Sequence, residues 1–238
     1  MQRQDVIRKC VDTLSMVITV FVVGFFAVKL ISLSASVPEP ALPAEQGSVI
    51  KVYTVILDAG HGGSDGGAVG RNGTVEAGLN LAVTKLVKAA LEADNVKVIM
   101  TRSDDSALGK TKNADMAERK RILNTENVDA VISIHMNKFN DRSVKGSMAF
   151  FMEGSTEGEK LAQAVIDAVT DATGQGRRAA NPGDYYVIRE TPTPAVIIEG
   201  GFLSNSDEEA MLKDPDYQAK LASGIANGIM AYLEQLPT

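Results

Sequence analysis

The sequence has 238 residues, of which 45% are hydrophobic and 23% charged, the balance of a globular protein that holds one large domain or two small ones. The net charge is −6, and an acidic protein argues against nucleic acid as a partner, because phosphate binding requires a basic surface. The single cysteine, Cys10, excludes a disulfide within the chain.

An apolar segment near the N-terminus is long enough to cross a membrane. Residues 14–33 are mostly apolar, and a helix needs about 20 such residues to span the hydrocarbon. Arg3, Arg8 and Lys9 precede the segment, and this positive charge predicts that the N-terminus stays in the cytoplasm. We therefore predict that residues 1–35 form a membrane anchor or a signal segment.

Three interpretations of this segment are open, one of which is a buried helix of a soluble domain. Cleavage near Ser34, where small side chains follow the apolar run, would make it a signal peptide. Its length and Lys29, whose long side chain can reach the outer interface, favour a retained anchor. Residues 36–50 carry three prolines and no periodicity, and we interpret them as a tether to a single domain over residues 51–238.

From residue 50 onward, strand-like and helix-like segments alternate. This pattern predicts one α/β domain with a central, mostly parallel twisted sheet flanked by helices. The predicted strands are 53–58, 97–101, 130–135, 146–152, 185–188 and 195–199. The predicted helices are 78–93, 115–124, 157–172 and 215–236. We expect the strand at 146–152 to lie at an edge of the sheet.

The sequence has only two histidines, and each follows an apolar run. His61 lies in a glycine-rich loop after the first predicted strand, His135 ends the third, and Glu199 ends the last. The carboxyl ends of parallel strands share one edge of a sheet, where ligands bind, so we expect these side chains to converge. Two imidazoles with carboxylates are the ligands that a catalytic zinc ion takes, with one position left for water. The pattern therefore predicts a zinc hydrolase.

Each candidate residue has a plainer interpretation when taken alone. The loop around His61 is typical of a turn, or of a phosphate-binding loop, although it lacks the Gly-Lys-Ser/Thr ending of a P-loop. His135 alone is typical of a core histidine. Glu76 stands just ahead of a helix, where a carboxylate commonly stabilises the helix dipole, and Asn80 lies one turn further on the same face. Glu199 alone is typical of a surface strand end, but burial there would raise its pKa toward that of a general base.

Three arginines are expected to form ion pairs rather than to act in the site. They are Arg102, Arg119 and Arg121. The carboxylates near them in the sequence are Asp104, Asp105, Asp115 and Glu118.

Several sequence segments together carry a resemblance to a known family. They include LDAGHGG (57–63), Glu76 with Asn80, SIHMN (133–137) and EGGFLSN (199–205). In this order and spacing, across residues 53–236, they resemble the zinc-dependent N-acetylmuramoyl-L-alanine amidases, called amidase type 3. Lys138 departs from the family pattern, because many members have a small residue at this position. The departure concerns substrate contacts at the rim of the site.

The resemblance implies a role for each candidate residue. His61, Glu76 and His135 would bind one Zn²⁺, and Glu199 would be the catalytic carboxylate. The implied reaction is hydrolysis of the amide bond between N-acetylmuramic acid and L-alanine of peptidoglycan by a zinc-activated water. Two other functions are open: a non-catalytic peptidoglycan-binding module of the same fold, and a glycosidase that uses Glu76 and Glu199 as paired carboxylates.

The order of segments is similar to that of the spore-cortex amidases that prepare muramic-δ-lactam. Those proteins have one membrane-directing segment, a short tether and a bare catalytic domain. The resemblance implies an extracytoplasmic location, anchored with the N-terminus inside or secreted to the cell wall, including the space between the membranes of a developing spore. We also expect a helper protein as a partner, because we find no wall-binding module in the sequence.

Overall fold

The computed structural model describes residues 51–176, 179–189 and 191–237. The predicted membrane or signal segment (1–35) and tether (36–50) lie outside these described residues. Among the helices of the described part, none combines the length and apolar character needed to cross a bilayer.

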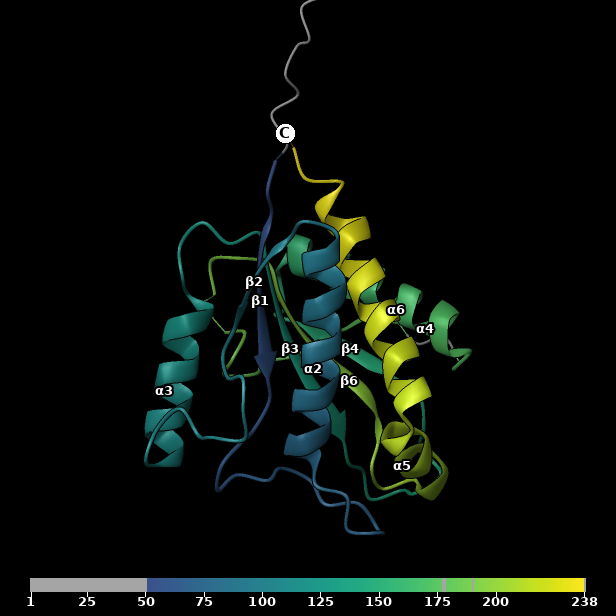
Figure 1. The fold of residues 1–238 in the computed structure, drawn as a ribbon. Helices are drawn as coiled ribbons and strands as arrows, with labels where there is room; N and C mark the ends of the chain where they lie inside the picture. The colour runs from purple at the N-terminus through teal and green to yellow at the C-terminus, as the bar shows by residue number, and fades with distance from the viewer. Residues whose placement is uncertain (1–50, 177–178, 190, 238) are drawn as a thin grey trace, which may run out of the picture. The chain divides into compact units, whose positions relative to one another are not determined.

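The described residues form a six-stranded sheet (Figure 1). In spatial order its strands are β2 (Lys97–Met100), β1 (Thr54–Ala59), β3 (Ala130–Asn137), β6 (Ala195–Phe202), β4 (Met148–Phe151) and β5 (Asn181–Pro182). The first four strands run parallel, β4 pairs antiparallel with β6, and β5 pairs parallel with β4. The predicted α/β class, a sheet flanked by helices, is confirmed.

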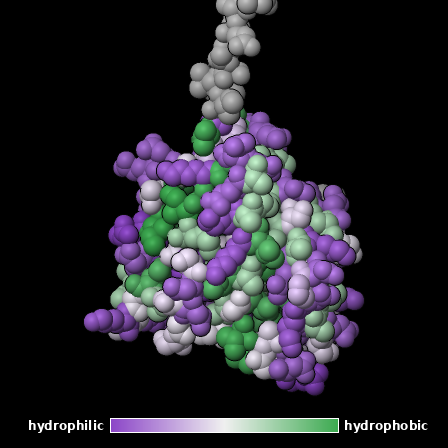
Figure 2. All heavy atoms as spheres, in the orientation of Figure 1, coloured by the Kyte–Doolittle hydropathy of each residue, from purple (hydrophilic) through white to green (hydrophobic). Residues whose placement is uncertain are grey.

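Helices cover both faces of the sheet. On one face lie α2 (Glu76–Ala93), α4 (Thr156–Thr173) and α6 (Pro215–Leu233), which enclose the larger core. The other face is covered by α3 (Lys112–Leu123) and by the buried side chains of Val187 and Ile188. Figure 2 shows the outer side of the helical layer, where hydrophilic residues cover much of the surface and hydrophobic ones lie between them.

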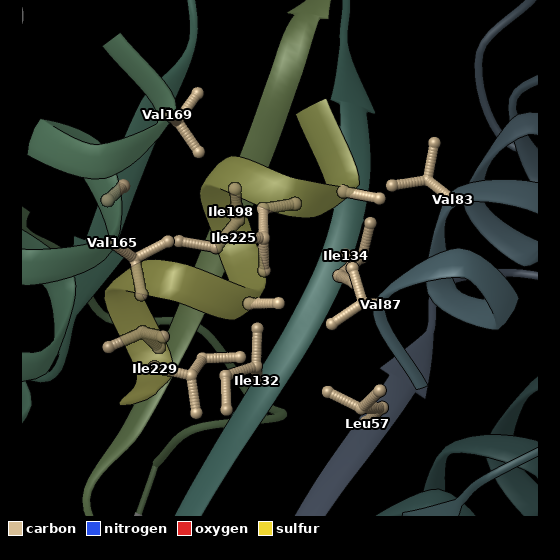
Figure 3. Packing of buried hydrophobic residues seen from close by; sticks show 14 of the residues in the cluster. Leu57, Val83, Val87, Ile132, Ile134, Val165, Val169, Ile198, Ile225 and Ile229 are labelled. Carbon is tan, nitrogen blue, oxygen red and sulfur yellow. The ribbon is translucent and has the colours of Figure 1, made fainter. Parts of the chain in front are cut away.

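Successive side chains of a strand point to opposite faces of the sheet and so contribute to both hydrophobic cores. In β3, Ile132 and Ile134 face the three-helix layer, whereas Val131, which precedes them, faces α3. Figure 3 shows Ile134 opposite Val83 and Val87 of α2. Each fully buried aliphatic side chain contributes about 1.5–3 kcal/mol, so strands that are apolar on both faces hold the sheet firmly between its two layers.

Side chains start most of the helices by accepting backbone N–H groups. Thr111 accepts the amide of Ala114 at the start of α3, and Ser155 does the same for α4. In contrast, α2 begins after Val75, which provides no capping side chain, and its first residue is Glu76. Glu76 thus stands at the start of a helix that has no capping side chain.

Three sequence predictions of the fold need correction. The strand predicted at 185–188 is wrong: Ile188 and Arg189 both donate their amides to the carbonyl of Tyr185, so the segment is a turn. Its apolar pair, Val187 and Ile188, is buried under the sheet, and this burial resembles a strand pattern. The strand predicted at 146–152 is not at the edge, because the two-residue β5 lies beyond β4. A helix, α5 (Ser206–Lys213), was not predicted.

Candidate metal centre

Three potential ligand residues meet at the carboxyl edge of the sheet. His61 lies two residues after β1, His135 lies near the end of β3, and Glu76 is the first residue of α2. The two imidazole centroids are 4.9 Å apart, and one ligand atom from each of the three residues lies within 4.8 Å of the other two. The fourth candidate, Glu199 in β6, is the direct register partner of His135. The structure thus brings together all four residues singled out in the sequence.

The spacing of the donor atoms fits a shared metal ion. Oε1 of Glu76 lies 3.2 Å from Nε2 of His61 and 3.0 Å from Nδ1 of His135. Donors on one tetrahedral zinc ion, each bonded at about 2.0–2.2 Å, stand a little over 3 Å apart. Although burial works in the opposite direction, hydrogen bonds from the two imidazoles hold the pKa of Glu76 far below its usual range. The carboxylate is therefore anionic, as a metal ligand must be.

Two glycines make room for the ligand side chains. A Cβ on Gly60 would stand 2.2 Å from Cε1 of His135. At Gly67, where φ is +70°, a Cβ would stand 2.5 Å from Oε2 of Glu76 and 2.7 Å from Cδ2 of His61. Real Cβ atoms do not approach so closely, so both positions require glycine. The glycine-rich loop is therefore shaped around the three ligands.

His61 itself adopts a left-handed conformation, with φ of 62°. A non-glycine residue held there carries strain of about 1–3 kcal/mol, and such strain is concentrated at functional sites. Its carbonyl accepts a hydrogen bond of 3.0 Å from Nη2 of Arg119. On the ring, Nδ1 lies 3.1 Å from Oδ1 of Asp65, which leaves Nε2 to face Glu76. A carboxylate on the outer nitrogen is a common way to fix a metal-binding histidine.

Neighbouring donors also fix the orientation of Glu76. Asn80 and the amide of Met136 each donate to Oε1 at 3.2 Å, and the amide of Ala68 donates to Oε2 at 2.7 Å. The supporting contact of Asn80 is the one expected from its place one turn after Glu76. The ligand carboxylate is thus held from the helix, from β3 and from the loop that precedes the helix.

Glu199 is a half-buried residue with one buried, unsatisfied carboxyl oxygen. Its Oε2 is buried, and no described residue hydrogen-bonds to it. Burial is the main cause that raises the pKa of Glu199 to about 7; the charge of Glu76 adds to the rise, and His135 opposes it. The expected effect of burial on this pKa is confirmed. A buried, unpartnered carboxyl is costly, so its position beside the ligand cluster indicates a role in chemistry.

A groove opens from the ligand cluster toward α3. Its volume is about 330 Å³. His61, His135 and Glu199 are among the residues that line it. Its apolar and aromatic lining residues are Met116, Tyr185, Tyr186, Val187 and Ile197. Charged residues line it as well, namely Asp65, Lys112, Asp115 and Arg119. A concave groove that combines apolar walls with polar groups is typical of a substrate site.

Comparison with known proteins decides the family. The family described as N-acetylmuramoyl-L-alanine amidase matches residues 55–231, which include all four site residues. The chain belongs to this family. Its enzymes are peptidoglycan amidases, and this chain is an amidase of the N-acetylmuramoyl-L-alanine type.

Relatives and solved structures agree with this family. The germination-specific N-acetylmuramoyl-L-alanine amidase of Bacillus subtilis (strain 168) is 33% identical over 190 residues, which cover 76% of this chain and 80% of the relative. The CwlD amidase of Clostridioides difficile, solved in complex with the GerS lipoprotein, has a TM-score of 0.74 at 34% identity and covers 76% of this chain and 98% of its own. The catalytic domain of CwlV from Bacillus (Paenibacillus) polymyxa has a TM-score of 0.70 at 34% identity, with coverages of 77% and 99%.

The three arginines singled out in the sequence of this amidase have different roles. Two of the expected ion pairs are confirmed, those of Arg119 with Asp115 and of Arg121 with Glu118. For Arg102 the expectation is wrong within the described residues, because it donates to main-chain carbonyls instead. Those carbonyls belong to Ala59, Gly60, Ala77 and Asp104. Arg102 therefore ties the loop that carries His61 to the start of α2.

The main partner of Arg119 was not predicted. It forms a buried ion pair with Asp58, a fully buried residue at the end of β1 that also accepts the hydroxyls of Thr101 and Ser133. Burial alone would raise the pKa of Asp58, but the charge of Arg119 and the hydroxyl hydrogen bonds lower it below its usual value. The pair therefore anchors the strand that leads into the His61 loop.

We expect Arg119→Met to destabilise the amidase by about 3–5 kcal/mol at pH 7, because it leaves a buried carboxylate without its cation. In the native protein the lowered pKa of Asp58 stabilises the fold above the unfolded pKa of about 3.9, and this contribution is lost as the pH falls through the folded value. In the variant Asp58 keeps its burial but loses Arg119, so it takes up a proton at higher pH.

The destabilisation should therefore shrink as the pH is lowered from 7 to 4. Urea unfolding of both proteins at several pH values measures it. Arg121→Met removes an exposed arginine of the same helix and serves as the control, with an expected change within about 0.5 kcal/mol. A loss of stability that is the same at pH 7 and pH 4 would assign the effect of Arg119 to packing instead of to charge.

Proposed function

We propose that this amidase hydrolyses the bond between the lactyl group of N-acetylmuramic acid and L-alanine with one zinc ion as cofactor. The proposed zinc ligands are His61, Glu76 and His135, and the proposed general base is Glu199. The observation that supports this most directly is the set of three donors within 4.8 Å of one another beside a carboxyl group with a raised pKa.

The chemistry follows from the roles of these groups. Bound at the three ligands, a zinc ion would polarise the scissile carbonyl and lower the pKa of a water molecule. Glu199 in its ionised form accepts a proton from the attacking water at Oε2, the oxygen that has no partner among the described residues. When the C–N bond breaks, Glu199 returns this proton to the leaving nitrogen of L-alanine. The products are a free lactyl carboxyl group and a free amine on the stem peptide.

The groove beside α3 is the proposed binding place for part of the substrate. Glu199 and the exposed Tyr185 and Tyr186 all line it. Phe150 supports the ring of Tyr185 at a centroid distance of 5.2 Å, and the ammonium group of Lys120 lies 5.0 Å from the centroid of Tyr186. Two aromatic rings held in this way offer a fixed surface to an extended glycan–peptide chain.

The biological setting is proposed from the relatives. The germination-specific amidase of B. subtilis and the CwlD amidase support a role in cell-wall or spore-cortex remodelling. The CwlD structure contains a lipoprotein, which supports a helper protein as a partner here. We further propose that residues 1–35 anchor or export the chain, that 36–50 form a tether, and that 51–238 act outside the cytoplasm.

Digestion of purified peptidoglycan by the full-length protein tests this function. Mass spectrometry should find stem peptides with a free L-alanine amine, and a chelator should stop their release until zinc is added back. A glycosidase that uses Glu76 and Glu199 would release new reducing sugar ends instead, and a non-catalytic binding module would release no product. Full activity in the presence of the chelator would contradict the proposed metal mechanism.

A further inference from the structure

The loop that carries Glu76 is held at its tip by a buried carboxylate from another helix. This carboxylate belongs to Glu209 of α5, which is 0% exposed. Its Oε1 and Oε2 accept the amide of Asn72 at 3.0 and 3.1 Å, Oε2 accepts the side-chain amide of Asn72 at 3.1 Å, and Oε1 accepts the amide of Thr74 at 3.3 Å. Residues 135 or more positions apart in the sequence are thereby joined.

The loop approaches this carboxylate very closely. A Cβ on Gly70 would stand 2.3 Å from Oε1 of Glu209, so the loop backbone lies directly against the carboxylate. The tip closes on itself through the amide of Gly70, which donates to the carbonyl of Thr74 at 2.9 Å. The tip is thus wrapped around a fixed negative charge, and its conformation depends on that charge.

The two sides of the loop connect its tip to the metal ligand. Val69 and Val75 face each other in an antiparallel bridge, and the amide of Glu76 donates to the carbonyl of Ala68 at 2.9 Å. The amide of Ala68 in turn donates to Oε2 of Glu76 at 2.7 Å, while Oε1 faces the two histidines. A short series of hydrogen bonds therefore connects Glu209, through the loop, to the carboxylate of Glu76. These hydrogen bonds help to orient that carboxylate.

The neighbour of Glu209 holds the other side of the site. Glu208, which is 1% exposed, accepts the amides of Gly146 and Phe202 at 2.8 Å each. Phe202 ends β6, the strand that carries Glu199. Two adjacent residues in the first turn of α5 thus contact the strand of the proposed base and the loop of the proposed ligand.

We propose that Glu209 is a positioning residue for the metal centre, which sets the zinc affinity of the site by fixing the loop from Gly66 to Glu76. This inference rests on the proposed function, because it takes Glu76 to be a zinc ligand. Glu209 touches none of the three ligands in the hydrogen bonds described above, so its effect passes through the loop. Loss of such outer contacts lowers metal affinity by about 10–100-fold in other metal sites.

Zinc affinity of the full-length protein, measured by competition with a chromophoric chelator, tests this role. Glu209→Gln keeps the volume of the side chain but turns one acceptor toward the loop into an N–H donor. We expect its dissociation constant for zinc to rise about 10–100-fold. Hydrogen exchange should also become faster at the amides of Asn72 and Thr74, which lose their fixed acceptor.

A matched control separates positioning from stability. Val165→Ala removes buried volume between α4 and α6, in the layer shown in Figure 3, and should lower the thermal stability without changing zinc affinity. If Glu209→Gln lowers stability as Val165→Ala does but binds zinc within twofold of the native protein, Glu209 has only a structural role and the inference is wrong.

The native protein and a second variant complete the test. If the native protein binds no zinc, the proposed function and this inference both fail, whereas native zinc binding with an unaffected Glu209→Gln rejects the inference alone. Glu209→Ala should weaken zinc binding at least as much as Glu209→Gln. If the alanine variant does not fold, the glutamine variant decides the result.

Discussion

Glu199→Gln is expected to lower kcat by about 10²–10⁴-fold while the protein still binds one zinc ion. Glutamine keeps the shape of the side chain but cannot accept the proton of the attacking water. The proposed metal ligands are other residues, so metal content should not change. Turnover of purified peptidoglycan and metal analysis of the same preparation measure the two effects. Loss of zinc together with activity would mean that Glu199 is a ligand and not the base.

The raised pKa of Glu199 also predicts how the activity depends on pH. The base form exists above the pKa, so kcat/KM of the native enzyme should fall tenfold per pH unit on the acid side. Burial places this pKa at about 7 without a metal, and a nearby cation lowers it, so the acid limb should lie at or below pH 7. Glu199→Gln should have no such limb.

Stability provides a second readout that does not depend on turnover. Because the folded pKa of Glu199 is raised, its protonated form stabilises the fold, and this contribution is lost as the pH rises through about 7. The metal-free variant should therefore be more stable than the metal-free native protein at pH 8 and equal to it near pH 4. Glu126→Gln, an exposed change before β3 at the opposite edge of the sheet, should alter neither activity nor stability.

The position of the site can be predicted from the sequence because most of its residues lie at or near the ends of predicted strands. His135 and Glu199 each lie near the carboxyl end of an apolar strand, and parallel pairing makes them direct neighbours. Gly60 and Gly67 can be recognised as part of a glycine-rich loop, but only the structure shows that each is needed to make room for a candidate ligand side chain. Local patterns therefore identify the candidate ligands but not the packing that shapes their cavity.

What the sequence did not predict depends on contacts between distant segments. Asp58 looks like an ordinary polar strand end, yet it is fully buried because Arg119, 61 residues later, reaches it. Glu209 belongs to α5, and a signal for that helix was available in Asn205 and Ser206 followed by three acidic residues, the pattern of a capped helix start. Its hydrogen bonds to the loop before Glu76 could not be read from spacing.

His61→Gly is expected to abolish amidase activity and to weaken zinc binding by more than the roughly 10–100-fold that follows the loss of an outer contact. Only Glu76 and His135 would remain as donors, one fewer than a catalytic zinc site uses. Asp65→Asn keeps all three donors and only loosens the His61 ring, so we expect it to weaken zinc binding by no more than about 10–100-fold. Competition with a chromophoric chelator ranks the two variants against the native protein.

Glycine is the informative replacement because the left-handed conformation of His61 suits it. His61→Ala would keep the backbone strain, whereas His61→Gly relieves it, so the metal-free glycine variant should be more stable than the alanine variant by about 1 kcal/mol. Both should lose zinc equally if the imidazole is the ligand. An inactive His61→Gly protein that is stable and still binds zinc as tightly as the native protein would show that His61 acts in another way.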